Sequence, residues 1–223
     1  MTAMVCGNLP EIIRNDHNLY EGNVVGYFQA IFNHAQNLLH PYHNFRHMFH
    51  VMWLCYQACI FYASTLSRRE MRDLIIAAMF HDFDHSGMMG SDDLNIERAV
   101  RGFEKYIARE DQAHAENIIS LIHVTEYPYQ IASKNLSLCG QIIRDADLSQ
   151  ALSPAWIQQV IFGLAAEWQK KPIEVLKAQG AFHKNLKLHT EWARQMFSQA
   201  DVDRKITEAG ELLDLLEMKP ATV

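Results

Sequence analysis

The seven residues Leu74–Phe80 are apolar without a break, and His81 and Asp82 follow them directly. Upstream, Ser67-Arg68-Arg69-Glu70 has the capping-box pattern, so the apolar segment is predicted to be a helix. A helix that is apolar on every side has to be surrounded by other elements. Its end is therefore buried, and the Asp82 carboxylate is costly to ionise there unless positive charge lies beside it.

The rest of the chain shows helical signals and scarcely any strand signals. No Asn-Gly or Asp-Gly hairpin turn occurs, and no long stretch alternates apolar and polar residues. Apolar spacing and capping signals predict the remaining helices, over Val24–Leu39, Phe45–Ala63, Asp92 or Asp93 to about Ile107, Asp111 to about Thr125, Ser153 to Leu164, a short helix from Pro172, Thr190–Phe197 and Arg204–Leu216. We predict an all-α fold of about nine helices in a single domain spanning residues 1–223.

The composition of the chain limits the cellular compartment and the kinds of binding partner that we expect for it. The formal charge is −6 and no Lys/Arg run occurs, which argues against a nucleic-acid partner. No signal-peptide pattern opens the sequence, and no apolar stretch reaches the ~20 residues needed to cross a bilayer. The cysteines, which lack CxxC spacing, are expected to be buried thiols: Cys6, Cys55, Cys59 and Cys139. We expect a cytoplasmic protein that is not membrane-bound.

Four polar islands carry candidate chemistry, at His43-Asn44-Phe45-Arg46-His47, His81-Asp82-Phe83-Asp84-His85, Asn95-Ile96-Glu97 and Asp145-Ala146-Asp147. Adjacent residues at a helix end differ by about 100° in direction, so His81 and Asp82 can both turn toward one metal ion. A lone His-Asp pair is more often a capping or hydrogen-bonding pair, but the four islands together predict a metal site. Imidazole and carboxylate suit Zn, Mn, Fe or Ni, and extra oxygen ligands would admit Mg at a second position.

In their order along the chain and in their residue types, the four islands resemble the motifs of the HD-domain metal-dependent phosphohydrolase superfamily. Within this superfamily they resemble the catalytic domain of class I cyclic-nucleotide phosphodiesterases. The resemblance covers about residues 40–150. The matching motifs are Tyr42-His43-Asn44-x-x-His47, His81-Asp82-x-Asp84-His85-x-Gly87, Asn95-x-Glu97-x-Ala99 and Ala146-Asp147-Leu148-Ser149.

The resemblance implies a single HD-type helical bundle that binds one or two divalent ions. It implies that the first ion is bound by His47, His81, Asp82 and Asp147, with Asp82 bridging to a second ion held largely by water. Asp147 is preferred over Asp145 because it lies inside Ala-Asp-Leu, and Asp145 is expected to be solvated or to act through another residue.

The same resemblance assigns roles in catalysis and in substrate binding. His43 would be the general acid that protonates the departing oxygen. Glu97 and His85 would orient His43 or the metal-bound waters. Gln195, close to Phe197, is similar to the glutamine that holds a purine ring, although its spacing from the phenylalanine differs from the family's pattern. These residues are the candidate catalytic and substrate-binding groups.

The predicted function is a metal-dependent phosphohydrolase, a phosphodiesterase acting on a 3',5'-cyclic nucleotide or a similar phosphate ester through a metal-activated water. The alternatives are a nucleotidase or deoxynucleoside triphosphate phosphohydrolase of the same superfamily, an HD-type di-iron oxygenase, and a non-catalytic nucleotide sensor. The oxygenase needs two further histidines, but His114 and His123 are nine residues apart and would lie on opposite sides of a single helix. A sensor predicts a missing ligand, yet all four are present. The question whether the chain forms a homodimer stays open.

Overall fold

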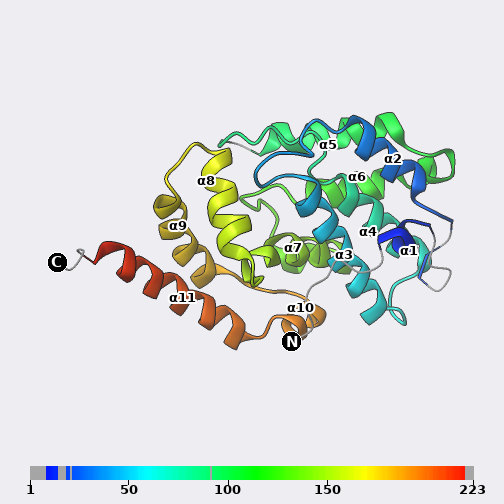
Figure 1. Cartoon of the computed structure of the whole chain (residues 1–223). Coiled ribbons are helices and arrows are strands. Elements are labelled where there is room, and N and C mark those ends of the chain that lie inside the picture. Colours follow the sequence, from blue (N-terminus) through cyan, green and yellow to red (C-terminus); the bar gives the residue numbers. More distant parts are fainter. Residues whose placement is uncertain (1–8, 15–18, 21, 91, 219–223) are drawn as a thin grey trace.

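The computed structural model describes residues 9–14, 19–20, 22–90 and 92–218. These residues contain eleven α-helices and no strand, which confirms the all-α prediction. The helices are α1 Leu9–Arg14, α2 Val25–His34, α3 Phe45–Phe61, α4 Arg68–Phe80, α5 Asp93–Tyr106, α6 Ala115–His123, α7 Leu138–Leu148, α8 Gly163–Glu167, α9 Pro172–Asn185, α10 Glu191–Met196 and α11 Gln199–Glu217 (Figure 1).

Helix α4 lies at the centre of the larger part of the molecule. Every residue of Leu74–Phe80 is 0% exposed, as the unbroken apolar run predicts. The capping box is formed, with the Ser67 side chain accepting from the Glu70 N–H and the Glu70 carboxylate accepting from the Ser67 N–H. Helices α2, α3, α5, α6 and α7 pack around α4 and bury the peptide groups at its end.

The buried apolar side chains form two clusters. The larger cluster is built mainly from α2 to α7 and includes Trp192 of α10. The smaller one surrounds Trp156 and lies between α8, α9, α11 and the segment Ile157–Phe162, which form the left side of Figure 1. Residues from both parts line the pocket described below, so the arrangement of the two clusters positions the candidate site.

Several helix boundaries differ from the prediction for local reasons. Helix α2 ends at His34, because the chain turns at Ala35 into an extended conformation; Leu39, which the periodicity placed on the buried face, is 97% exposed. The helix expected from Ser153 is π-helical over Ile157–Phe162 before it continues as α8, and such wide turns are frequent near functional sites. The helix that begins at Pro172 has 14 residues and is not short.

Two other expectations concern the cysteines and the membrane. Cys55, Cys59 and Cys139 are buried free thiols, as predicted, and Cys6 lies outside the described residues. Within the described part of the chain, none of the helices combines the length and the apolarity required to cross a bilayer.

Candidate metal centre and its pocket

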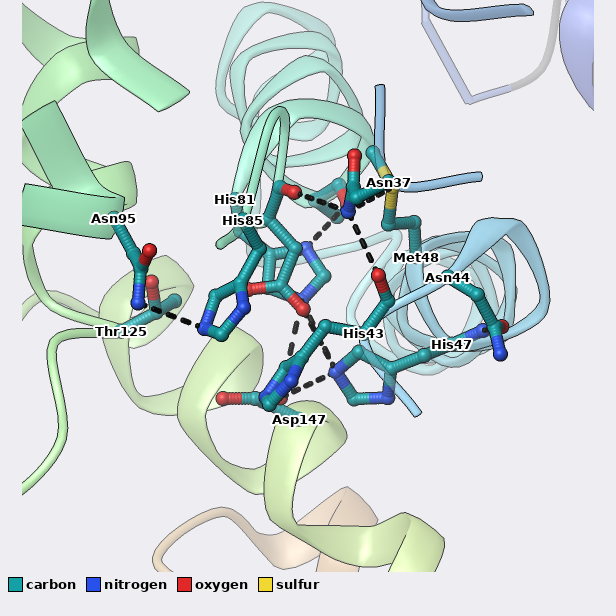
Figure 2. Close-up of polar contacts among 12 residues, drawn as sticks. Asn37, His43, Asn44, His47, Met48, His81, His85, Asn95, Thr125 and Asp147 are labelled. Carbon is teal, nitrogen blue, oxygen red and sulfur yellow. Dashed lines mark hydrogen bonds and ion pairs between the residues drawn. The ribbon is translucent and has the colours of Figure 1, made fainter. Parts of the chain in front are cut away.

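Three side chains, His47, His81 and Asp82, bring one ligand atom each to a common point, within 4.8 Å of one another, and Asp147 brings a fourth atom beside the two histidines. His47 lies on α3, His81 and Asp82 follow α4, and Asp147 lies near the end of α7. His47 Nε2 is 3.2 Å from Asp82 Oδ2 and 3.1 Å from Asp147 Oδ1. His81 Nε2 is 3.4 Å from Asp82 Oδ2 and 3.8 Å from Asp147 Oδ1. Figure 2 shows the His47 ring and the Asp147 carboxylate close together, with the His81 ring beside them.

The second nitrogen of each histidine has an oxygen partner that orients the ring. His47 Nδ1 lies 2.6 Å from Gln150 Oε1, and His81 Nδ1 lies 2.8 Å from the Ala78 carbonyl oxygen. Each Nδ1 can therefore donate its hydrogen, which leaves the Nε2 lone pair directed at the common point. Such partners fix the tautomer of metal-binding histidines. Gln150 is a residue that sequence reasoning missed.

The charge balance of this group favours a cation. Asp82 Oδ2 is buried, and its close polar neighbours among the described residues are His47 Nε2 at 3.2 Å and His81 Nε2 at 3.4 Å. Burial lowers the pKa of His47, but its hydrogen bonds to Asp147 and Asp82 and the negative charge of both carboxylates outweigh burial and raise the pKa to about 10. The two carboxylates thus attract positive charge to this common point. Two imidazoles and two carboxylates fit Zn, Mn, Fe or Ni.

A second group beside this point contains His43 and Glu167. His43 Nδ1 contacts Glu167 Oε1, while Glu167 Oε2 accepts the backbone N–H groups of Tyr42 and His43 at 2.8 and 3.0 Å. Burial raises the pKa of Glu167, but the hydrogen bond with His43 and its charge outweigh burial and lower the pKa to about 2. Glu167 therefore stays ionised at neutral pH and orients the His43 ring.

Glycines permit this contact between distant segments. Gly87 has φ +71°, and a Cβ there would lie 2.9 Å from Glu167 Cγ, so a larger residue would displace the carboxylate. Gly163 opens α8, and a Cβ on it would lie 3.0 Å from the Pro41 carbonyl oxygen. Glycine at both positions lets α8 approach the loop that carries His43.

His85 lies between the His43 ring and α5. Its ring stacks on that of His43, with centroids 3.6 Å apart. His85 Nδ1 accepts the Gly87 N–H at 3.0 Å, and His85 Nε2 is 3.0 Å from Asn95 Nδ2 and 3.6 Å from Asp92 Oδ1. Burial lowers the pKa of His85, but Asp92 outweighs burial and raises it. The prediction that His85 acts next to His43 agrees with this position.

Asn37 connects the two groups and was also missed. It is 0% exposed, and its Nδ2 donates to the carbonyl oxygens of His43 and Asp82, both at 2.8 Å. Its Oδ1 accepts the Asp84 N–H at 3.0 Å. Figure 2 shows the amide between the two segments. One side chain thus fixes the backbone of the candidate acid relative to that of a candidate metal ligand.

One side of a pocket of about 410 Å³ is lined by His43, His47, Asp82, His85 and Asp147. The other side is formed by the smaller cluster and by α9, including Gln179 and Phe182. Gln179 is 8% exposed, and its Oε1 is buried without a hydrogen-bond partner among the described residues. The pocket therefore has charged groups at one end and an amide beside an aromatic ring at the other.

Two predicted site residues are not brought to this pocket. Glu97 is exposed on the outer face of α5 and pairs with Arg101 at 3.3 Å. Gln195 is exposed on α10, and its Nε2 donates to Glu191 Oε1 at 3.0 Å. The structure thus does not support the roles assigned to them. Glu167 contacts His43 where Glu97 was expected, and Gln179 lies in the pocket where Gln195 was expected.

The expectation that Asp145 is solvated is also corrected. Asp145 is 1% exposed, and its carboxylate accepts the backbone N–H groups of His189 and Thr190 and the Thr190 hydroxyl, at 2.7 to 3.0 Å. It anchors the start of α10 to α7. The neighbouring Asp147 faces the common point, as the helix geometry predicts for residues two apart.

The structure also bears on the alternatives. Neither His114 nor His123, the further histidines that a di-iron oxygenase would need, lines the pocket. Among the described residues, the histidines lining it are His43, His47 and His85. The four predicted ligand residues are present and lie near one another, whereas a decayed sensor site predicts a missing one.

The comparison with known families agrees with this geometry. Residues 42–101 match the sequence model of the family described as 3'5'-cyclic nucleotide phosphodiesterase. The matched segment begins at Tyr42, includes the His81-Asp82 turn and ends within α5. The resemblance to class I cyclic-nucleotide phosphodiesterases is thereby confirmed over these residues. No curated protein matches the chain.

Proposed function

We propose that the chain is a metal-dependent phosphodiesterase that hydrolyses a 3',5'-cyclic nucleotide. The observation that carries the proposal is the grouping of His47, His81 and Asp82, with Asp147 beside the two histidines, next to the pair formed by His43 and Glu167. The match of residues 42–101 to the cyclic nucleotide phosphodiesterase family supports the choice of substrate class.

The metal would be held by His47, His81, Asp82 and Asp147. Bound there, a divalent ion lowers the pKa of a coordinated water and offsets the charge of the phosphoryl group. The protein contributes the orientation of its ligands, because Gln150 and the Ala78 carbonyl fix the two rings. Asp82 would also serve a second divalent ion held largely by water.

His43 would supply the proton to the departing ribose oxygen. Its Nδ1 hydrogen is engaged by Glu167, so the transferable proton resides on Nε2. Burial lowers the pKa of His43, although the hydrogen bond that its ring makes to the Glu167 carboxylate opposes that effect. A positioned imidazole contributes about 10²–10⁴ to a rate by general acid catalysis.

The opposite end of the pocket would bind the base. A nucleobase carries ring N–H or amino donors in the plane of its ring, and the unpartnered Gln179 Oε1 is an acceptor for one of them. Phe182 lies one helical turn further along α9 and lines the same pocket, where it can contact the face of the base. The pocket volume of about 410 Å³ lies within the usual range for small-ligand sites.

A panel of nucleotides tests the proposal directly. Cyclic 3',5'-nucleotides, nucleoside monophosphates and deoxynucleoside triphosphates are each assayed with Mn, Mg, Co and Zn. We expect hydrolysis of a cyclic nucleotide to a monophosphate, and no hydrolysis in an Asp82→Asn variant. Release of phosphate from monophosphates, or of triphosphate from deoxynucleotides, with no action on cyclic substrates would replace the proposal by the corresponding alternative. Oxygen uptake by an iron-loaded protein would favour the oxygenase.

A further inference from the structure

A second pocket lies on the other side of His85. It has a volume of about 720 Å³ and is lined by α5, the turn after α4 and residues of the segment 34–40. His85 is the one residue that lines both this pocket and the candidate active site. The proposed phosphodiesterase mechanism uses no other residue of this second pocket.

Three cationic side chains of α5 line it. Arg98, Arg101 and Lys105 are spaced three and four residues apart, so they share one face of the helix and extend over about 10 Å along it. The chain as a whole has a net charge of −6, and this face has the opposite sign. Asp84 is the one carboxylate that lines the pocket, and its Oδ1 accepts the Gln36 N–H at 2.7 Å.

Few negatively charged side chains of the protein lie close enough to neutralise these three cations. Within the described residues, neither Arg98 nor Lys105 forms an ion pair, and Lys105 Nζ lies 5.0 Å from the centroid of the Tyr106 ring. Arg101 pairs with Glu97, but both side chains are more than half exposed, at 64% and 57%. His40 also lines the pocket, and its buried Nδ1 has no hydrogen-bond partner in the described part of the chain.

We propose that this pocket binds a polyphosphate anion, that is, a compound with two or more linked phosphoryl groups. A guanidinium group donates paired hydrogen bonds to phosphate oxygens, and an ammonium group adds a point charge. A single phosphoryl group can contact only neighbouring members of a row about 10 Å long, whereas linked groups can engage the whole row. The inference does not depend on the proposed activity.

Calorimetric titration of the full chain with inorganic pyrophosphate, at low ionic strength and without added divalent metal, tests the site. We expect saturable binding that is tighter than that of orthophosphate. The variant Arg98→Gln/Arg101→Gln/Lys105→Gln should bind pyrophosphate at least about tenfold more weakly. The control Lys134→Gln/Lys184→Gln/Lys187→Gln changes the net charge by the same amount at exposed positions and should stay within about twofold of the native chain.

Two single variants sharpen the test. Glu97→Gln removes the acid that pairs with Arg101 and should tighten pyrophosphate binding. Asp82→Asn alters the candidate metal centre and should leave pyrophosphate binding unchanged, so failure of this site and failure of the proposed activity are distinguishable. If the triple variant does not fold, the single variant Arg98→Gln tests the same site and should also bind pyrophosphate more weakly than the native chain. Equal weakening in the two triple variants, absence of saturable binding, or loss of binding in Asp82→Asn would overturn the proposal.

Discussion

The histidines of the site differ in the partner of their second nitrogen, and that partner separates candidate ligand from candidate acid. His47 and His81 are oriented by neutral oxygens, from Gln150 and the Ala78 carbonyl. His43 is oriented by the ionised Glu167. Glu167 accepts from Nδ1 of His43, so a proton that His43 transfers would leave from Nε2, whereas the neutral acceptors at Nδ1 of His47 and His81 leave their Nε2 atoms available to an ion. The roles are therefore separable by mutation.

Asp147→Asn should lower bound metal and halt turnover, because a neutral amide cannot offset the charge of a cation. Metal content after dialysis, measured by atomic emission, is the direct readout. Asp203→Asn, on the exposed face of α11, is the matched control and should keep its metal. Unchanged metal content in Asp147→Asn would remove Asp147 from the ligand set.

His43→Ala should reduce kcat by about 10²–10⁴ for a cyclic nucleotide and keep its metal. A p-nitrophenyl phosphodiester has a leaving group that needs little protonation, so the deficit should be much smaller with it. Steady-state kinetics with both substrates measure the difference. Equal losses accompanied by loss of metal would make His43 a ligand instead of an acid.

Asn37→Ala should destabilise the fold by about 3 kcal/mol. The substitution leaves the buried carbonyl oxygens of His43 and Asp82 and the Asp84 N–H without their partner, at about 1–3 kcal/mol for each buried unpaired group. Urea unfolding measures the change. Asn185→Ala removes a single exposed hydrogen bond and should cost less than about 0.5 kcal/mol. Similar values for the two variants would contradict the bridging role of Asn37.

At the scale of elements, the site depends on how closely α8 approaches the turn after α4. Gly87→Ala places a methyl group 2.9 Å from Glu167 Cγ in a backbone conformation that disfavours alanine. We expect lower kcat and a loss of about 1–3 kcal/mol in stability. Gly210→Ala on α11 meets no atom within 4 Å and should stabilise the chain by about 0.5–1 kcal/mol. Opposite signs for the two variants in thermal unfolding check this expectation.

The elements also explain which parts of the site the sequence could predict. The four candidate ligands and His43 lie in short motifs whose spacing has chemical meaning, and the structure places them near one another. Glu167 lies 124 residues from His43, and the residues around it form no motif of known chemistry. The sequence alone therefore did not identify it as a partner of His43. Gln179 was missed because its role depends on how α9 packs, whereas Gln195 and Glu97 carried the expected residue type on an exposed face. Tertiary packing, which spacing does not encode, decided these positions.

At the scale of the whole molecule, a buried charged network joins α4 to the segment before α6. Asp111 is 0% exposed and accepts hydrogen bonds from Arg69, Arg72 and Tyr27, at 2.7 to 2.8 Å. Burial raises its pKa, but the hydrogen bonds, led by that of Arg72, outweigh burial and lower it to about 2. The network therefore contributes stability that depends on pH.

Since the folded pKa of Asp111 lies below the ordinary unfolded value near 4, its contribution is present above about pH 4 and is lost as the pH falls toward 2. Asp111→Asn should destabilise the chain by about 3 kcal/mol at neutral pH, and the gap to the native chain should narrow between pH 4 and pH 2. Urea unfolding at a series of pH values measures it. A gap that stays constant over this range would show that the network does not titrate there.

Helix α4, the most buried helix among the described residues, ends at two of the candidate metal ligands. This position links metal binding at the proposed site to the stability of the fold. His81 and Asp82 follow α4 directly, and α4 has no solvent-facing residue over its last two turns. The amides in the last two turns of α4 should therefore exchange with deuterium only when the whole molecule opens. His81 and Asp82 then cannot separate through local fraying of α4, so we expect a substitution that loosens the core around α4 to weaken metal binding at the proposed site as well.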